Sequence, residues 1–173
     1  MRRVWWEVPV VAALGMLAWL ALGPAVATIP ALYVAAVTPT LTRIDLAEHR
    51  LPNRLVVPGL AVGLLAAAGS WGTTGIPPFV PLVAGVAYGG ALFVFALAGG
   101  MGMGDVKLAA VLGLASPTAT VAIASPLLAF LTGGLVSVVV LAVRGRGTRI
   151  PFGPFLLLGH AGALGAAALL ATS

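Results

Sequence analysis

The amino-acid sequence predicts an all-α fold, a polytopic membrane helix bundle with six to seven transmembrane helices. Of its 173 residues, 61% are hydrophobic and only 8% are charged, whereas a soluble domain carries about a quarter charged residues. The apolar residues also fall in long runs that approach the roughly 20 residues a membrane-spanning helix needs. No composition change marks a boundary, so we expect a single integral-membrane domain over residues 1–173.

Seven candidate spans follow one another along the chain. They cover residues 6–23, 28–44, 55–70, 79–98, 106–123, 126–143 and 151–171. Trp5 and Trp6 precede the first span and suit a membrane interface. Pro117 lies inside the fifth span; we expect it to kink that helix, because a helix ending there would be too short to cross. The segment "ASP" at 124–126 is expected to separate the fifth and sixth spans.

The basic residues predict the orientation. They are Arg2, Arg3, Arg43, Arg50, Arg54, Lys107, Arg144, Arg146 and Arg149. In a seven-span layout they all fall on one side, which the positive-inside rule makes cytoplasmic, together with the N-terminus. Scattered in this way they form no continuous phosphate-binding face, so no nucleic-acid partner is expected. The segment "RGRGTR" at 144–149 is expected to contact anionic lipid headgroups.

Two further interpretations concern processing and metals. The start "MRR", an apolar run and "AVA" at 25–27 loosely resemble a secretory signal, but the run is long for one, so we expect the first span to be retained. The chain has no cysteine, which excludes disulfides, thiolate zinc sites and a catalytic cysteine. It also lacks HExxH and clustered histidines. We therefore expect no metal and no cofactor.

Two of the four acidic residues stand out. Asp45 follows the second span and Asp105 precedes the fifth, so both belong to the cytoplasmic side. If those two spans pack together, the carboxyl groups meet in a poorly hydrated place and tend to share one proton. Such a pair can activate water as general base and general acid. The alternative is that both carboxylates are solvated, or merely favourable near a helix N-terminus.

Glycines surround the second aspartate, at Gly99, Gly100, Gly102 and Gly104. Glycine permits backbone conformations and close approaches that other residues do not. A strand-like or unwound segment there would present backbone groups to an extended peptide, provided that protein or water covers it. A flexible turn is the plainer alternative.

Three segments resemble one known family. "MGMGDVKL" at 101–108 resembles the GxGD signature of membrane aspartyl proteases, and most closely that of the type IV prepilin (leader) peptidases. "IDLAEHRLPNRLVVP" at 44–58 is similar to that family's first catalytic segment. "RIPFGPFLLLG" at 149–159 is similar to its Pro-Phe-Gly-Pro segment. The three occur in the family's order over roughly residues 40–160.

The resemblance implies an endopeptidase that removes the short leader of prepilins or pseudopilins at the cytoplasmic membrane face. Asp45 and Asp105 would be its catalytic pair. Its partners would be that substrate and membrane lipid; the oligomeric state stays open. The supporting residues that the motifs imply are Gly102, Gly104, Lys107, Pro52, Pro151 and Gly153. Lys107 would bias the pair or hold the turn; alternatively, it reaches the cytoplasm and only marks topology.

Longer members of that family carry a cytoplasmic segment, often with zinc-binding cysteines, after the first span, and also methylate the new N-terminus. This chain has "GPAVATIP" there and no cysteine. It therefore resembles the short, peptidase-only members, and we predict no methyltransferase activity, methyl donor or zinc.

Two other classes of function stay open at this point. One is a proton- or cation-coupled transporter, and the other is a non-catalytic assembly component. His160, within the last span, is expected to bond between helices rather than to catalyse. His49 and Glu48 are expected to be solvated.

Overall fold

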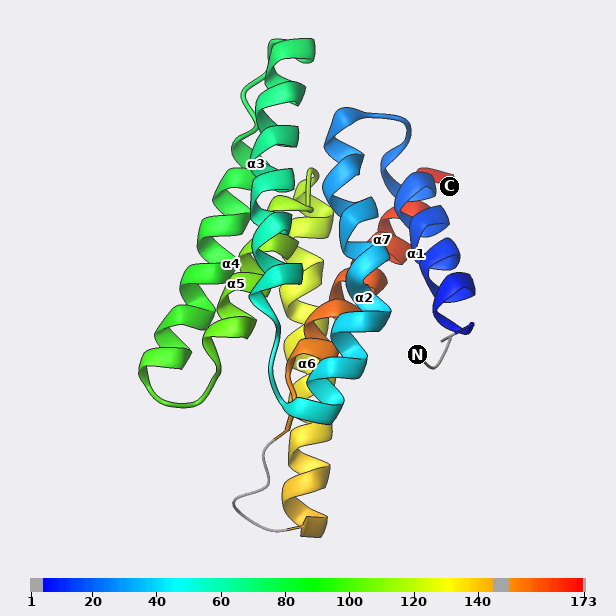
Figure 1. Cartoon of the computed structure of the whole chain (residues 1–173). Coiled ribbons are helices and arrows are strands. Elements are labelled where there is room, and N and C mark those ends of the chain that lie inside the picture. The colour runs from blue at the N-terminus through cyan, green and yellow to red at the C-terminus, as the bar shows by residue number, and fades with distance from the viewer. Residues whose placement is uncertain (1–4, 145–149, 173) are drawn as a thin grey trace.

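The computed structural model describes residues 5–144 and 150–172, which form seven α-helices, one short 3-10 turn and no strand (Figure 1). The elements are α1 (Glu7–Leu22), η1 (Val26–Thr28), α2 (Ile29–Glu48), α3 (Asn53–Thr74), α4 (Phe79–Leu97), α5 (Met103–Leu114), α6 (Ala119–Arg144) and α7 (Gly153–Thr172). The predicted all-α helix bundle is confirmed.

Among the described residues, four helices are long and apolar enough to cross a membrane, namely α3, α4, α6 and α7; α1 is apolar but shorter. Large apolar side chains such as Leu65, Val86 and Leu131 are exposed on the outer surface, as expected where lipid rather than water covers a protein. These features fit a membrane helix bundle. The exact number of crossings and the single-domain organisation stay predictions.

The helices alternate in direction. α4 packs mainly on α5, α6 on α7, α1 on α2 and α7, and α3 on α5 and α2. The α2–α3 and α4–α5 connections and the start of α7 therefore meet at one end of the bundle, the lower end in Figure 1. We call this the aspartate end. The connections 23–28, 75–78 and 115–118 lie toward the opposite end.

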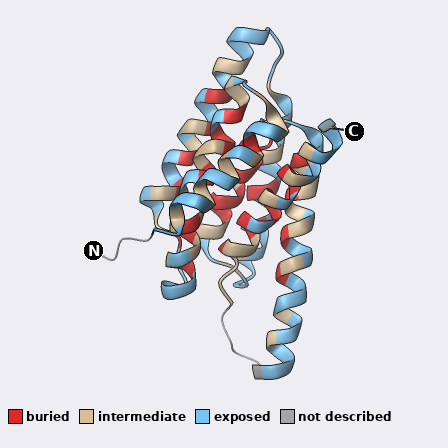
Figure 2. Ribbon diagram, turned by 90° about the vertical axis from the view of Figure 1, so that its right-hand side faces the viewer, coloured by how far each residue is buried: buried red, intermediate tan, exposed pale blue. Residues whose placement is uncertain are grey.

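The main hydrophobic core surrounds α5, which contacts α2, α3, α4 and α7. Val106, Leu108 and Leu112 are buried within it, and the buried residues gather in the interior of the bundle in Figure 2. Gly113 brings α5 directly against α4, because a Cβ there would collide with the backbone of Ala84. A smaller apolar cluster lies where α1, α2, α6 and α7 meet.

The break between the fifth and sixth helices was predicted at the wrong place. α5 ends at Leu114 and is 12 residues long, or about 18 Å, and Pro117 lies in the following connection. The expectation that Pro117 only kinks the helix is wrong, since proline disfavours the helical conformation of the residue before it. The expected break at 124–126 is also wrong, because Pro126 lies inside α6.

Two other boundaries differ from the expected spans. α2 continues to Glu48, so Asp45 lies in its last turn rather than after it. The expected headgroup-binding segment, 144–149, lies outside the described residues apart from the backbone of Arg144, and its role stays a prediction.

Candidate active site

Asp45 is buried at the aspartate end, with 3% of its surface exposed. Its Oδ2 accepts a hydrogen bond of 3.0 Å from the backbone N–H of Gly153, the first residue of α7. The first N–H groups of a helix have no partner within the helix, and the positive end of the helix dipole favours a carboxylate. Asp45 therefore caps α7 from the end of another helix.

The chain leaves Asp45 through a tight turn. His49 ends α2 in a left-handed conformation, with φ 52°, and its N–H donates to the backbone oxygen of Asp45 at 2.9 Å. This reversal directs the chain through Leu51 and Pro52 into α3. The Pro52 carbonyl accepts hydrogen bonds from the first turn of α3, so Pro52 shapes this helix start.

Asp105 lies in the first turn of α5. A hydrogen bond from the backbone of Gly102, which precedes the helix, reaches its carboxylate, the arrangement by which a third helical residue satisfies the N-cap amide. Gly99 turns the chain out of α4 with a positive φ of 77°. Residues 99–102 contain no strand, and Gly102 has an extended backbone conformation.

Both aspartates line one cavity of about 610 Å³. Its walls come from the end of α2, the α4–α5 connection, α6 and the segment before α7. The lining residues are Asp45, His49, Gly99, Gly100, Met101, Gly102, Asp105, Ser137, Ile150, Pro151 and Phe152. The second and fifth spans of the sequence thus bring their carboxyl groups to the same space.

Burial and mutual repulsion perturb both carboxyl groups. Burial and the negative charge of Asp45 raise the pKa of Asp105 to about 6, against the lowering effect of the Gly102 hydrogen bond. Burial also raises the pKa of Asp45, opposed by the Gly153 hydrogen bond and the positive charge of His49. Two neighbouring carboxyls that resist ionisation retain a shared proton in mildly acidic solution. One acid and one base are then available together.

Comparison with known proteins decides the family. The model of the type IV leader peptidase family matches residues 31–142, a range that includes both aspartates. This chain belongs to the type IV leader peptidase family. It is 34% identical over 146 residues to a curated prepilin leader peptidase/N-methyltransferase of Pseudomonas putida, covering 76% of this chain and 49% of that relative. The chain thus spans about half the length of the relative. No solved structure matches it.

The other motif residues of this leader peptidase family member divide into two groups. Pro151 and Gly102 line the cavity, and Gly153 holds Asp45. Lys107 does not line it: its Nζ donates to Asn53 Oδ1, at the start of α3, at 3.0 Å. Gly104 lies against Leu51 rather than in the cavity wall.

Two cavity residues, His49 and Phe152, were not among the site residues that the sequence predicts. His49 is exposed, as expected, and also lines the cavity beside Asp45, whereas Glu48 is exposed and pairs with Arg50. Phe152 also lines the cavity and contacts the ring of Phe130 on α6, with centroids 5.7 Å apart. Position within the motif segments was the available signal for His49 and Phe152.

His160 lies away from the cavity. It is buried, and its Nδ1 lies 3.4 Å from the Oγ of Ser125 on α6. This is the interhelical contact that its position in the last span predicts. Within the described residues, no group of three or more acidic and histidine side chains is placed to hold a metal ion.

Proposed function

We propose that this protein is a membrane aspartyl endopeptidase that removes the leader of type IV prepilins or pseudopilins at the cytoplasmic face of the cell membrane. One observation carries the proposal. In a member of the leader peptidase family, Asp45 and Asp105 arrive from separate helices at a single cavity of about 610 Å³. The raised pKa of Asp105 supports a pair in which one carboxyl is protonated while the other is ionised, as hydrolysis requires.

The reaction follows from that protonation state. The ionised carboxylate takes a proton from water, whose oxygen attacks the scissile carbonyl carbon, while the protonated carboxyl donates its proton to the carbonyl oxygen. The tetrahedral intermediate then collapses. The C–N bond breaks, the amine leaves with a proton from the carboxyl that first acted as base, and the other carboxyl regains its own.

The cavity walls favour a peptide in extended form. Gly99, Gly100 and Gly102 line the cavity, and a glycine backbone lets another backbone approach closely. The titratable side chains among the described lining residues are Asp45, His49 and Asp105, so recognition of a basic leader rests on shape more than on charge. The basic residues of this end give the cytoplasmic orientation that we propose.

Cleavage of co-expressed prepilins tests the proposal. We expect the wild type to cut, and Asp45→Asn and Asp105→Asn each to lose about 10²–10⁴-fold in rate while remaining at wild-type levels in membranes. Glu48→Gln is the matched control, since Glu48 is exposed and pairs with Arg50 outside the cavity. Cleavage that survives either aspartate change contradicts the aspartyl mechanism.

The same assay separates the other classes of function. A wild-type protein that cuts none of several diverse prepilins contradicts the peptidase proposal and returns weight to a transporter or an assembly component. The absence of methyltransferase activity stays a prediction, tested by mass spectrometry of the new N-terminus of any cleaved product.

A further inference from the structure

We propose that the α2–α3 connection, residues 49–52, together with Asn53 at the start of α3, is the positioning element that fixes where Asp105 lies relative to Asp45, with Leu51 as its principal contact. The effect of this element on catalysis rests on the proposed function, whereas its effect on the distance between the two aspartates does not. The end of α2 binds the start of α7 directly, through Asp45 and Gly153, whereas α2 and α5 contact each other less than either contacts α7. The placement of Asp105 relative to Asp45 therefore depends on what packs between α5 and the other two helix ends.

Leu51 occupies that position. It is 8% exposed and belongs to the main hydrophobic core. A Cβ built on Gly104, next to Asp105, would lie 3.0 Å from the Leu51 Cβ. A Cβ built on Gly153 would lie 3.2 Å from Leu51 Cδ2 and 2.7 Å from Asp45 Oδ2. One leucine thus separates the glycine that adjoins the second aspartate from the glycine that binds the first.

The two ends of the connection contact α2 and α5. At its start, the His49 N–H bonds the backbone of Asp45. At its end, Asn53 accepts the hydrogen bond from Lys107, two residues beyond Asp105. The Lys107 bond is exposed and contributes less than a buried contact would. Leu51 therefore carries most of the constraint, and Asn53 adds to it.

This arrangement gives both glycines a reason for their place in the motifs. A Cβ at Gly104 would press on Leu51, and a Cβ at Gly153 would press first on Asp45 Oδ2 and then on Leu51. Packed interiors transmit small displacements rather than absorb them. A shortened side chain at position 51 thus lets the start of α7 shift relative to the start of α5, and the two carboxyl groups separate.

A distance measurement tests the geometry without any substrate. The chain has no cysteine, so Leu46→Cys and Met103→Cys, at residues 59% and 51% exposed beside the two aspartates, accept spin labels selectively. Double electron–electron resonance in nanodiscs should give one narrow distance distribution. We expect Leu51→Ala to shift or broaden it. Leu164→Ala, at a residue 3% exposed in the smaller cluster, is the matched core control and should leave it unchanged.

Activity provides the second readout. We expect Leu51→Ala to lower kcat by about 10²-fold with KM unchanged, because a displaced catalytic group loses orientation rather than affinity. Leu51→Met, which conserves volume, should restore most of the rate. Asn53→Leu should lower kcat, by less than about tenfold. Asn53→Asp keeps an acceptor for Lys107 and should leave kcat unchanged.

Each outcome bears on the proposal. An unchanged distance distribution in Leu51→Ala, or equal broadening in Leu164→Ala, overturns it, as does a rise in KM at constant kcat. If the wild type cuts no prepilin, the proposed function fails, while the spin-label distances still decide whether the connection positions the pair.

Discussion

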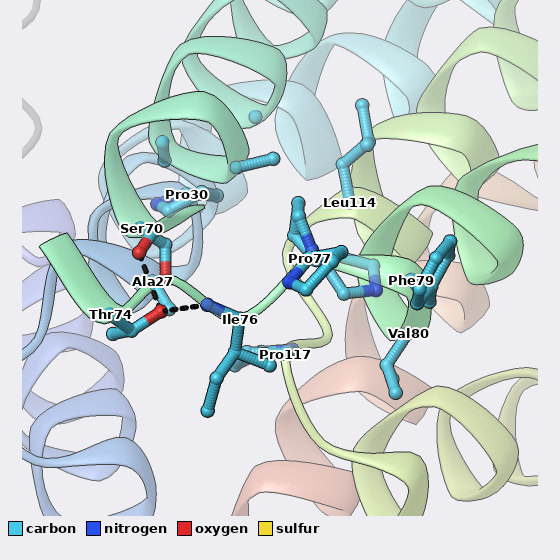
Figure 3. Close-up of a pocket in the computed structure, with 15 residues that line it drawn as sticks. Ala27, Pro30, Ser70, Thr74, Ile76, Pro77, Phe79, Val80, Leu114 and Pro117 are labelled. Atoms are coloured by element: carbon cyan, nitrogen blue, oxygen red, sulfur yellow. Dashed lines mark hydrogen bonds between the residues drawn. The ribbon is translucent and has the colours of Figure 1, made fainter. Parts of the chain in front are cut away.

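The two ends of the bundle carry cavities of different chemistry. At the opposite end, a pocket of about 290 Å³ lies between η1, α3, the start of α4 and Pro117. None of the described residues that line it is titratable. Figure 3 shows how its polar groups satisfy one another: the Thr74 hydroxyl donates to the Ser70 carbonyl at 2.8 Å and accepts from the Ile76 N–H at 3.2 Å.

The aspartate end differs because its polar groups are held by helix ends rather than by each other. Asp45 and Asp105 are bound by single backbone groups of Gly153 and Gly102. Both side chains line the cavity, and burial raises the pKa of each. Two carboxyl groups with perturbed pKa values in one cavity mark a candidate reaction site, whereas the turn at Thr74 satisfies its own hydrogen bonds. This contrast predicts that changes at the two ends affect different properties.

Among the changes that compare the two ends, the largest effect is expected at Gly153. Gly153→Ala places a Cβ within 2.7 Å of Asp45 Oδ2, which displaces that carboxylate, and a misplacement of about 1 Å can lower a rate about 10²-fold. Prepilin cleavage with purified protein should show this loss in kcat. Unchanged cleavage would mean that the Gly153–Asp45 contact is irrelevant to the reaction.

The corresponding glycine change at the opposite end should leave the chemistry intact. Gly63→Ala places a Cβ 2.7 Å from the Leu114 Cβ, and overpacking costs about 1–3 kcal/mol. We expect a lower melting temperature in detergent with kcat and KM near wild type below it. A selective loss of kcat in Gly63→Ala would contradict the expectation that changes at the opposite end affect stability and not the reaction.

The pH dependence of cleavage is a further test of the difference between the two ends. Because the pKa of Asp105 is raised to about 6, kcat/KM should fall by up to tenfold per pH unit as the pH rises above that value and the shared proton is lost. Rates at several pH values, with Gly63→Ala as the control that keeps the same profile, measure this. A flat profile from pH 5 to 8 contradicts the shared proton.

The free energy of unfolding should also depend on the ionisation of Asp105. The pKa of Asp105 in the folded state, about 6, exceeds its ordinary value of 3.8, so the folded protein binds this proton more tightly. The resulting stabilisation is complete below about pH 4 and is lost as the pH rises through 6. Asp105→Asn should therefore gain stability relative to wild type between pH 4 and 7 in thermal unfolding. A constant difference between the two proteins over that range would contradict the raised pKa.

The smallest effect is expected at Thr74. Thr74→Val removes two hydrogen bonds in an exposed turn, where water replaces them, so the loss of stability should be no more than about 1 kcal/mol. Cleavage should be unchanged. A marked loss of activity would show that the opposite end contributes to the reaction after all.

The helix breaks illustrate what sequence patterns leave undecided. Pro117 and Pro126 both lie in apolar surroundings, yet one ends a helix and the other does not. Gly159 explains the second case, because α7 lies directly on the backbone of Ser125 and Ala129 at that place. A neighbouring helix can make an internal proline tolerable in a membrane protein, and such packing is invisible in a local pattern.

The sequence by itself determined the helical class, the shared end of Asp45 and Asp105 and the three motifs, since these follow from apolar run lengths, charge placement and local residue order. Only the tertiary structure decided that Gly153 binds Asp45, that Leu51 lies between Gly104 and Gly153 and that His49 lines the cavity. The Asp45–Gly153 contact joins residues 108 positions apart. Contacts of this kind depend on how whole helices pack, which no local pattern of side chains specifies.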